Sequence, residues 1–172
     1  MHKTINKCKM KKLLILAVTA VMSVGAAHAQ TPVTYQGEVD LGYSIGVGNF
    51  ATGRLNVHTV QGVAIGDYLS TGLGLGVDYY HELESVFVPL YLNLKGCLPV
   101  SGVVSPYVSF DIGYGFGVSE DVSGLSGLYC SPAIGVRVKA FKAQLGYNAQ
   151  RVSESGIGFT MGAIQIKVGF VF

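Results

Sequence analysis

Charged residues are scarce in this sequence, at 13% of 172 residues, and tryptophan is absent. An apolar run near the N-terminus, residues 13–24, has only 12 residues, whereas a membrane-spanning helix needs about 20. This run is therefore too short for a transmembrane helix. Glycine, in contrast, occurs 24 times. Because glycine weakens helices, the composition favours short strands joined by tight turns.

Residues 1–29 have the features of an export signal. Five lysines precede the apolar run, and Ala27-His28-Ala29 follows it as a small-x-small cleavage pattern. We predict a signal peptide cleaved after Ala29, which leaves residues 30–172 as one domain. A retained N-terminal anchor is the alternative. The five lysines are Lys3, Lys7, Lys9, Lys11 and Lys12.

The slight positive charge of the whole chain comes from this leader. Five of the 12 basic residues lie in residues 1–29, and all ten acidic residues lie beyond them. The mature protein is therefore expected to carry a net negative charge. This balance gives no reason to propose nucleic-acid binding, which requires a basic surface.

Strict alternation of apolar and polar residues dominates the rest of the chain. In residues 33–48 the odd positions are mostly apolar, while the even positions are polar or glycine; a period of two indicates a strand. Parity is least regular at Val60 and Gln61. Longer and shorter connections alternate, as in an up-and-down meander. We predict eight strands and no helix, at residues 33–48, 54–66, 68–80, 86–96, 105–118, 127–138, 140–150 and 163–172.

The charged residues of these strands all fall on the polar parity. The remaining charged residues fall in expected turns or loops, including Arg151 and Glu154 in a loop at residues 151–156. One face of every strand is therefore expected to carry no charge. The charged positions on the polar face are the acids Glu38, Asp40, Asp78 and Asp111, and the bases Arg54, Lys95, Arg137, Lys142 and Lys167.

Two features predict that the apolar face points outward, toward lipid. Glycines crowd the polar face, which suits the narrow inside of a small closed barrel. Aromatic residues gather near both ends of the apolar face, as two girdles flanking a bilayer would. The glycines are Gly72, Gly74, Gly76, Gly113, Gly115 and Gly117. The girdle residues are Tyr35, Phe170 and Phe172 near the termini, and Tyr79, Tyr114, Phe116, Tyr147 and Phe159 near the opposite end.

The mature chain resembles the eight-stranded outer-membrane β-barrels of Gram-negative bacteria, and is similar to the transmembrane domain of outer-membrane protein A. The resemblance rests on the leader, the eight alternating strands, segments such as GLGLGVDYY and SPYVSFDIGYGFG, and the terminal VGFVF. It implies an all-β, antiparallel, up-and-down transmembrane barrel in the outer membrane. It also implies that Phe170 and Phe172 form the signal read by the barrel-assembly machinery. No peptidoglycan-binding domain is present in the sequence, so no cell-wall tether is implied.

We expect the lumen to be filled by paired side chains. An eight-stranded barrel is only wide enough to be packed by side chains, so we predict that the lumenal acids and bases pair across strands. Hydrogen bonds from Tyr80, Tyr91, Tyr107, His58 and Gln144 would complete this network. The alternative is a narrow conduction path lined by the same residues.

Catalytic, cofactor and metal sites are not expected. His58 has lumenal parity and is interpreted as a structural histidine. His81 lies beside Glu82 and Glu84, but one histidine with two carboxylates is a weak zinc signal. Acidic residues of the long-loop set could instead bind divalent cations that bridge lipopolysaccharide. These acids are Glu82, Glu84, Glu120, Asp121 and Glu154.

The two cysteines of the mature chain are predicted to remain free thiols. An even number of cysteines in an exported protein suggests a disulfide. However, Cys97 falls in the turn after the fourth strand, and Cys130 falls on the lipid face toward the other rim. A disulfide requires Cα atoms within about 7 Å, which this arrangement forbids.

The sequence therefore predicts a non-enzymatic, monomeric outer-membrane protein with a filled lumen, which contributes to envelope structure or presents small surface loops. Its partners would be outer-membrane lipid, lipopolysaccharide and, during biogenesis, the assembly machinery. The alternatives are a narrow channel or transporter for small solutes, and a secreted lipocalin-like barrel with its apolar face inside.

Overall fold

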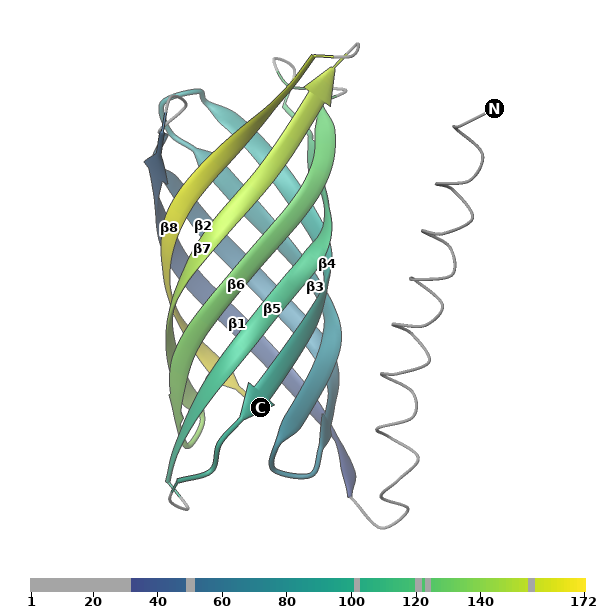
Figure 1. Ribbon diagram of the computed structural model, residues 1–172, viewed down its shortest axis with the longest axis vertical. Coiled ribbons are helices and arrows are strands. Elements are labelled where there is room, and N and C mark those ends of the chain that lie inside the picture. Colours follow the sequence, from purple (N-terminus) through teal and green to yellow (C-terminus); the bar gives the residue numbers. More distant parts are fainter. Residues whose placement is uncertain (1–31, 49–51, 101–102, 120–121, 123–124, 155–156) are drawn as a thin grey trace, which may run out of the picture. The chain divides into compact units, whose positions relative to one another are not determined.

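Eight antiparallel strands form a closed barrel in the computed structural model (Figure 1). Each strand pairs with its neighbours in sequence, and β8 pairs with β1 to close the sheet. The structure describes residues 32–48, 52–100, 103–119, 122, 125–154 and 157–172, with only the backbone at residues 152–154 and 157–159. The strands are β1 (Val33–Val47), β2 (Arg54–Ile65), β3 (Leu69–Tyr80), β4 (Ser85–Cys97), β5 (Val104–Gly117), β6 (Ser126–Val138), β7 (Phe141–Glu154) and β8 (Ile157–Val171).

The predicted signal peptide, residues 1–29, lies outside the described residues. Within the described part of the chain, no helix is long and apolar enough to cross a membrane.

The two ends of the barrel differ in their connections. One end, called here the terminal end, carries the start of β1, the end of β8, and the connections 66–68, 98–103 and 139–140 (lower end in Figure 1). The opposite, loop end carries the connections 48–53, 81–84, 118–125 and 155–156. Lys139, in the two-residue turn between β6 and β7, has a positive φ of 56°.

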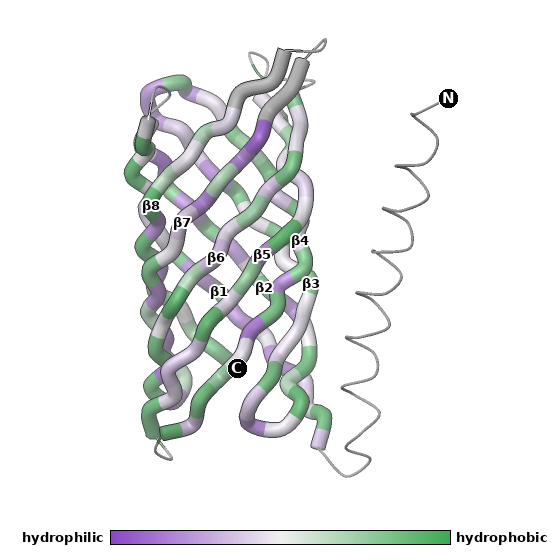
Figure 2. Tube along the Cα trace, in the orientation of Figure 1, coloured by the Kyte–Doolittle hydropathy of each residue, from purple (hydrophilic) through white to green (hydrophobic). Residues whose placement is uncertain are grey.

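The apolar face of the sheet is the outside of the barrel. Leu41, Leu92 and Ile166 are 53%, 41% and 55% exposed, while Asp40 is buried. Figure 2 shows the resulting alternation of hydrophobic and hydrophilic residues along the strands. The barrel is therefore inverted relative to a soluble one, because its charged groups are enclosed and its apolar side chains face outward.

The alternation continues through the part of β2 where the sequence was least regular. Residues Val33 to Ser44 of β1 pair with Ile65 to Arg54 of β2 without a break. Val60 is buried in the lumen and Gln61 is exposed on the outside. Gln61 accepts a hydrogen bond from the Tyr35 hydroxyl and donates one to Thr59 Oγ1 at 2.8 Å. Neighbouring polar groups thus satisfy this outward amide.

The last hairpin is longer than the sequence predicted. Residues 151–154, expected in a loop, are part of β7, and β8 begins at Ile157 rather than at residue 163. Arg151 pairs with Thr160 and is exposed at outward parity. The prediction that no charge lies on the outward parity is therefore wrong at this position. A sheet needs only backbone hydrogen bonds to extend, so β7 and β8 continue where the apolar pattern has stopped.

The lumenal glycines make room for large side chains opposite them. A Cβ atom added at Gly74 would collide with the Tyr91 ring, and one added at Gly76 would collide with the His58 ring. At Gly115 the obstacle is the Gln150 amide. The glycines on the polar face are thus the spaces into which the lumenal side chains pack.

Replacement of Gly74 by alanine should destabilise the barrel by about 1–3 kcal/mol, the usual cost of overfilling a packed interior. Gly96→Ala is the matched control, because a Cβ there meets only Val108 Cγ2, at 3.7 Å. Urea unfolding in lipid vesicles measures both free energies. Equal unfolding free energies for the two variants would contradict a tightly packed lumen.

Candidate functional site

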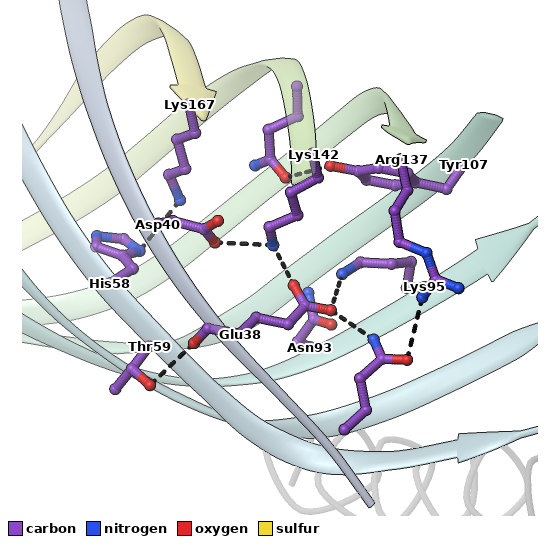
Figure 3. Close-up of polar contacts among 12 residues, drawn as sticks. Glu38, Asp40, His58, Thr59, Asn93, Lys95, Tyr107, Arg137, Lys142 and Lys167 are labelled. Atoms are coloured by element: carbon purple, nitrogen blue, oxygen red, sulfur yellow. Dashed lines mark hydrogen bonds and ion pairs between the residues drawn. The ribbon is translucent and has the colours of Figure 1, made fainter. Parts of the chain in front are cut away.

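The Glu38 cluster is the main charge cluster of the lumen, and three strands contribute to it. Lys95 from β4 and Lys142 from β7 each contact one carboxylate oxygen of Glu38 on β1 (Figure 3). Lys142 Nζ also lies 2.9 Å from Asp40 Oδ2, and Gln36 donates a 2.7 Å hydrogen bond to Glu38. All the ionised groups of this cluster are buried. Two acids and two bases therefore compensate one another away from water.

A histidine occupies the centre of the lumen. His58 Nε2 lies 2.9 Å from Asp78 Oδ1, and Nδ1 lies 3.1 Å from Lys167 Nζ and 3.0 Å from the Tyr91 hydroxyl. Because a lysine ammonium group can only donate, Nδ1 acts as acceptor, so Nε2–H donates to Asp78. His58 is thus held by three fixed partners, in a structural role.

Toward the loop end, an arginine organises a second polar layer. Arg54 donates to the Tyr80 hydroxyl and to the side-chain oxygen of Asn148. Asn56 donates to Asp78 and accepts a 2.6 Å hydrogen bond from Ser44. These contacts link β1, β2, β3 and β7 across the lumen.

Apolar side chains pack together toward the loop end of the lumen. Tyr80, Phe87, Val122 and Met161 form a buried cluster, in which the rings of Tyr80 and Phe87 are 5.3 Å apart. A second cluster, of Val60, Tyr91 and Tyr129, packs near His58. Phe87, Val122, Tyr129 and Met161 were not predicted to fill the lumen. For Phe87, its position on the inward-facing parity of β4 could have indicated that it lies in the lumen.

At the terminal end the lumen opens into a polar hollow of about 340 Å³, called here the vestibule. Its lining includes Arg137, Gln36, Ser70, Asp67 and Cys97. Arg137 is the least buried of the predicted lumenal charges and donates a 3.5 Å hydrogen bond to the side-chain oxygen of Gln36. The other eight acids and bases are buried, as four of each sign: Glu38, Asp40, Asp78 and Asp111 with Arg54, Lys95, Lys142 and Lys167. Arg137 is thus an additional positive charge at the mouth.

Two further lumenal hydrogen bonds involve predicted residues. Tyr107 donates to Gln144 at 3.0 Å, and Asn93 donates to Asp111 at 2.5 Å. Eight buried side-chain atoms of the described residues lack a protein partner, among them Tyr129 Oη and the amide nitrogens of Asn148, Gln150 and Gln165. Buried polar groups of this kind usually bind ordered water.

Aromatic side chains lie on the outer wall near both ends. Near the termini Phe141, Phe170 and Phe172 pack in sequence, with ring centroids 5.5 Å and 6.4 Å apart. Phe172 lies over Gly37, where a Cβ would be 2.5 Å from its ring. The other predicted girdle residues with described side chains are exposed: Tyr35, Tyr79, Tyr114, Phe116 and Tyr147. The Phe159 side chain lies outside the described residues, and the exposed Tyr68 and Phe141 were not predicted.

The loop acids and the cysteines offer no assembled site among the described residues. His81 Nε2 is 3.8 Å from Glu82 Oε1, and both side chains are half exposed. No group of three potential metal ligands occurs in the described part of the chain. Glu120 and Asp121 lie outside it, as does the side chain of Glu154. Cys97 and Cys130 are free thiols, as predicted.

Comparisons with known proteins support the same architecture. No family model matches the chain, and no curated protein sequence matches it. Solved structures do match. The N-terminal β-barrel domain of Pseudomonas aeruginosa OprF is 17% identical with a TM-score of 0.53, covering 82% of this chain and all of that one. The fold is that of the small outer-membrane β-barrels.

Two further barrels show how varied this fold is in sequence. Neisserial surface protein A is 10% identical with a TM-score of 0.56, covering 82% of this chain and 99% of that one. The outer membrane enzyme PagL is 7% identical with a TM-score of 0.58, covering 77% and 97%. Because PagL is an enzyme, the shared fold by itself does not decide whether this chain is one.

Glu38→Gln should lower the free energy of unfolding by about 3–5 kcal/mol, because it leaves two buried lysines without their shared carboxylate. Glu82→Gln removes an exposed carboxylate of the same type and should change stability by less than about 0.5 kcal/mol. Urea titration of both variants in vesicles provides the measurement. A Glu38→Gln barrel as stable as the wild type would show that the cluster is not a stabilising centre.

Proposed function

We propose that this protein is an integral outer-membrane protein, and that the whole apolar band of its outer wall lies within the bilayer. The observation that carries the proposal is the inversion of the barrel. Exposed aliphatic residues such as Leu73 and Ile134 cover the outer surface of the barrel, while eight charged side chains are buried in the lumen. Monomeric soluble proteins rarely expose a continuous apolar surface of this extent. In a bilayer the same surface contacts hydrocarbon, and the closed sheet leaves no unpaired strand edge.

The terminal end faces the periplasm in this proposal, and the loop end faces outward. Outer-membrane barrels have short periplasmic turns and longer external loops. The connection between β6 and β7 has two residues, whereas residues 118–125 separate β5 from β6 at the other end.

The proposed role is structural and non-enzymatic, with a lumen that conducts no solute. Three groups of buried side chains follow one another along the lumen. They are the Glu38 cluster, His58 with its partners, and the apolar cluster that contains Phe87. His58 is enclosed by its three partners and cannot reach a substrate. Among the described residues, the exposed His81 lies 3.8 Å from one carboxylate, that of Glu82, and its ring stacks with that of Tyr43.

The proposed partners follow from the surfaces of the barrel. Lipid and lipopolysaccharide would cover the apolar band, and the assembly machinery would read the C-terminal aromatic residues. All strand edges are paired within one chain, which is consistent with a monomer.

Fractionation and planar-bilayer recording test insertion and plugging separately. The protein should remain in the outer-membrane fraction until detergent is added, and purified protein should give no steady current. Recovery in soluble form without detergent would refute the membrane assignment and favour a secreted ligand-binding barrel. Steady ion-selective current would instead support the channel alternative.

Phe172→Ser should reduce the amount of barrel assembled in the membrane several-fold, because the terminal aromatic residue is lost. Phe141→Ser is the control, since Phe141 lies in the same aromatic cluster but is remote from the C-terminus in sequence. Heat-modifiable gel mobility of membrane fractions measures the assembled fraction. Equal losses for both variants would indicate a packing effect rather than an assembly signal.

A further inference from the structure

Two hollows adjoin at the terminal rim, one on each face of the wall. The outer groove, a hollow of about 1030 Å³, is lined by Tyr68, Leu98, Val136, Ala143 and other residues of the outer wall. The vestibule lies on the lumenal side. Cys97, the last residue of β4, lines both hollows. Val136 and Arg137 are consecutive in β6; Val136 lines the outer groove and Arg137 lines the vestibule. The two hollows are therefore separated only by the thickness of the barrel wall.

The outer groove is apolar, and small residues create it. Gly96 and Ala143 occupy outward positions next to larger outward residues of the same strands, Leu94 and Leu145. A Cβ added at Gly96 would meet only Val108 Cγ2, at 3.7 Å. Exposed Leu98, Ile134 and Leu145 form the sides of the depression. The groove is an open depression in the outer wall, and its apolar lining suits a hydrocarbon chain.

The vestibule offers polar groups that have no strong partner within the protein. Arg137 makes no ion pair among the described residues, and its hydrogen bond to Gln36 is long, at 3.5 Å. Ser70 is only 6% exposed, yet its hydroxyl has no hydrogen-bond partner. Figure 3 shows Arg137 reaching into the lumen near Lys95, whose ammonium is already held by Glu38. The Arg137 guanidinium and the Ser70 hydroxyl both line this hollow, and charged and hydroxyl donors of this kind are suited to bind a phosphate group.

An acidic group also lines the vestibule. Asp67, in the turn between β2 and β3, is exposed and makes no ion pair in the described part of the chain. Its carboxylate would accept hydrogen bonds from an ammonium group. The vestibule thus combines a phosphate site and an ammonium site, which is the charge pattern of a zwitterionic headgroup.

We infer that the terminal rim binds one phospholipid whose headgroup carries a phosphate and an ammonium group. Its acyl chains lie in the outer groove, and its headgroup turns over the rim at Cys97 to reach Arg137, Ser70 and Asp67. The exposed Tyr68 in the groove supports placing the headgroup at the membrane surface, because tyrosine concentrates at the membrane–water interface. A second copy of the barrel would cover the apolar groove but would leave the polar groups of the vestibule unused.

This inference rests on the proposed membrane insertion, which vesicle flotation measures independently. Purified barrel is mixed in mild detergent with phosphatidylethanolamine or phosphatidylglycerol, and native mass spectrometry counts the bound lipid. The wild type should retain one phosphatidylethanolamine in preference to phosphatidylglycerol. Arg137→Gln should weaken binding about tenfold, the usual effect of losing a charge-assisted hydrogen bond. Ser70→Ala should weaken it by a smaller factor.

Two other variants separate the parts of the site. Asp67→Asn should abolish the preference for the ethanolamine headgroup, and Ala143→Phe should weaken binding of both lipids by filling the groove. Lys139→Gln, which removes a neighbouring exposed charge that lines neither hollow, is the control and should bind as the wild type does.

Several results would overturn the inference while leaving the proposed function intact. These are wild-type binding by Arg137→Gln or Ala143→Phe, equal retention of the two lipids by the wild type, or an equal loss in Lys139→Gln. Each variant is first checked for folded gel mobility, so that a loss of binding is scored only for assembled barrel. Failure of the wild type to float with vesicles would instead refute the proposed function itself.

Discussion

Closure of the sheet between β1 and β8 is the constraint on which the rest of the molecule depends. In hydrocarbon an unpaired backbone N–H or C=O group costs several kcal/mol, so a sheet with free edges could not occupy a bilayer. Ten residue pairs, from Glu38–Val171 to Val47–Gly162, join the first strand to the last. Once the sheet is closed, each strand has one face toward the axis and one toward the surroundings. Most polar residues are then accommodated inside, in the loops or at the rims, while outward ones such as Gln61 are satisfied by polar neighbours on the wall.

The narrow lumen explains why each of its buried charged residues has a polar partner. Eight strands enclose a space that side chains fill, so a buried charge has no water to solvate it. Glu38 is shared by two lysines, and Lys142 also contacts Asp40. His58 connects Asp78 to Lys167. Gly74 and Gly76 leave space for the rings of Tyr91 and His58, which complete this packing. The same arrangement underlies the proposal that no solute passes through the barrel.

The terminal rim differs from the rest of the barrel because its polar groups are only partly satisfied. Arg137 and Asp67 line a polar hollow at this end, whereas Phe87, Val122 and their neighbours form a buried apolar cluster toward the loop end. This asymmetry places the available binding chemistry at the end proposed to be periplasmic. The outer groove adds an apolar surface to the same rim. A headgroup and an acyl chain can therefore be recognised at one place in the structure.

The sequence alone determined the strand number, the parity of Glu38, Asp40 and Lys167, and the outward direction of Leu41 and Ile166, because these depend only on a period of two. It could not determine where β7 ends and β8 begins, since beyond the apolar band backbone pairing continues without a side-chain pattern. It also could not show that Val122 covers the lumen or that Lys95 and Lys142 meet at one carboxylate. Those contacts join residues from distant strands. Only the closed tertiary structure, with its particular register and tilt, brings them together.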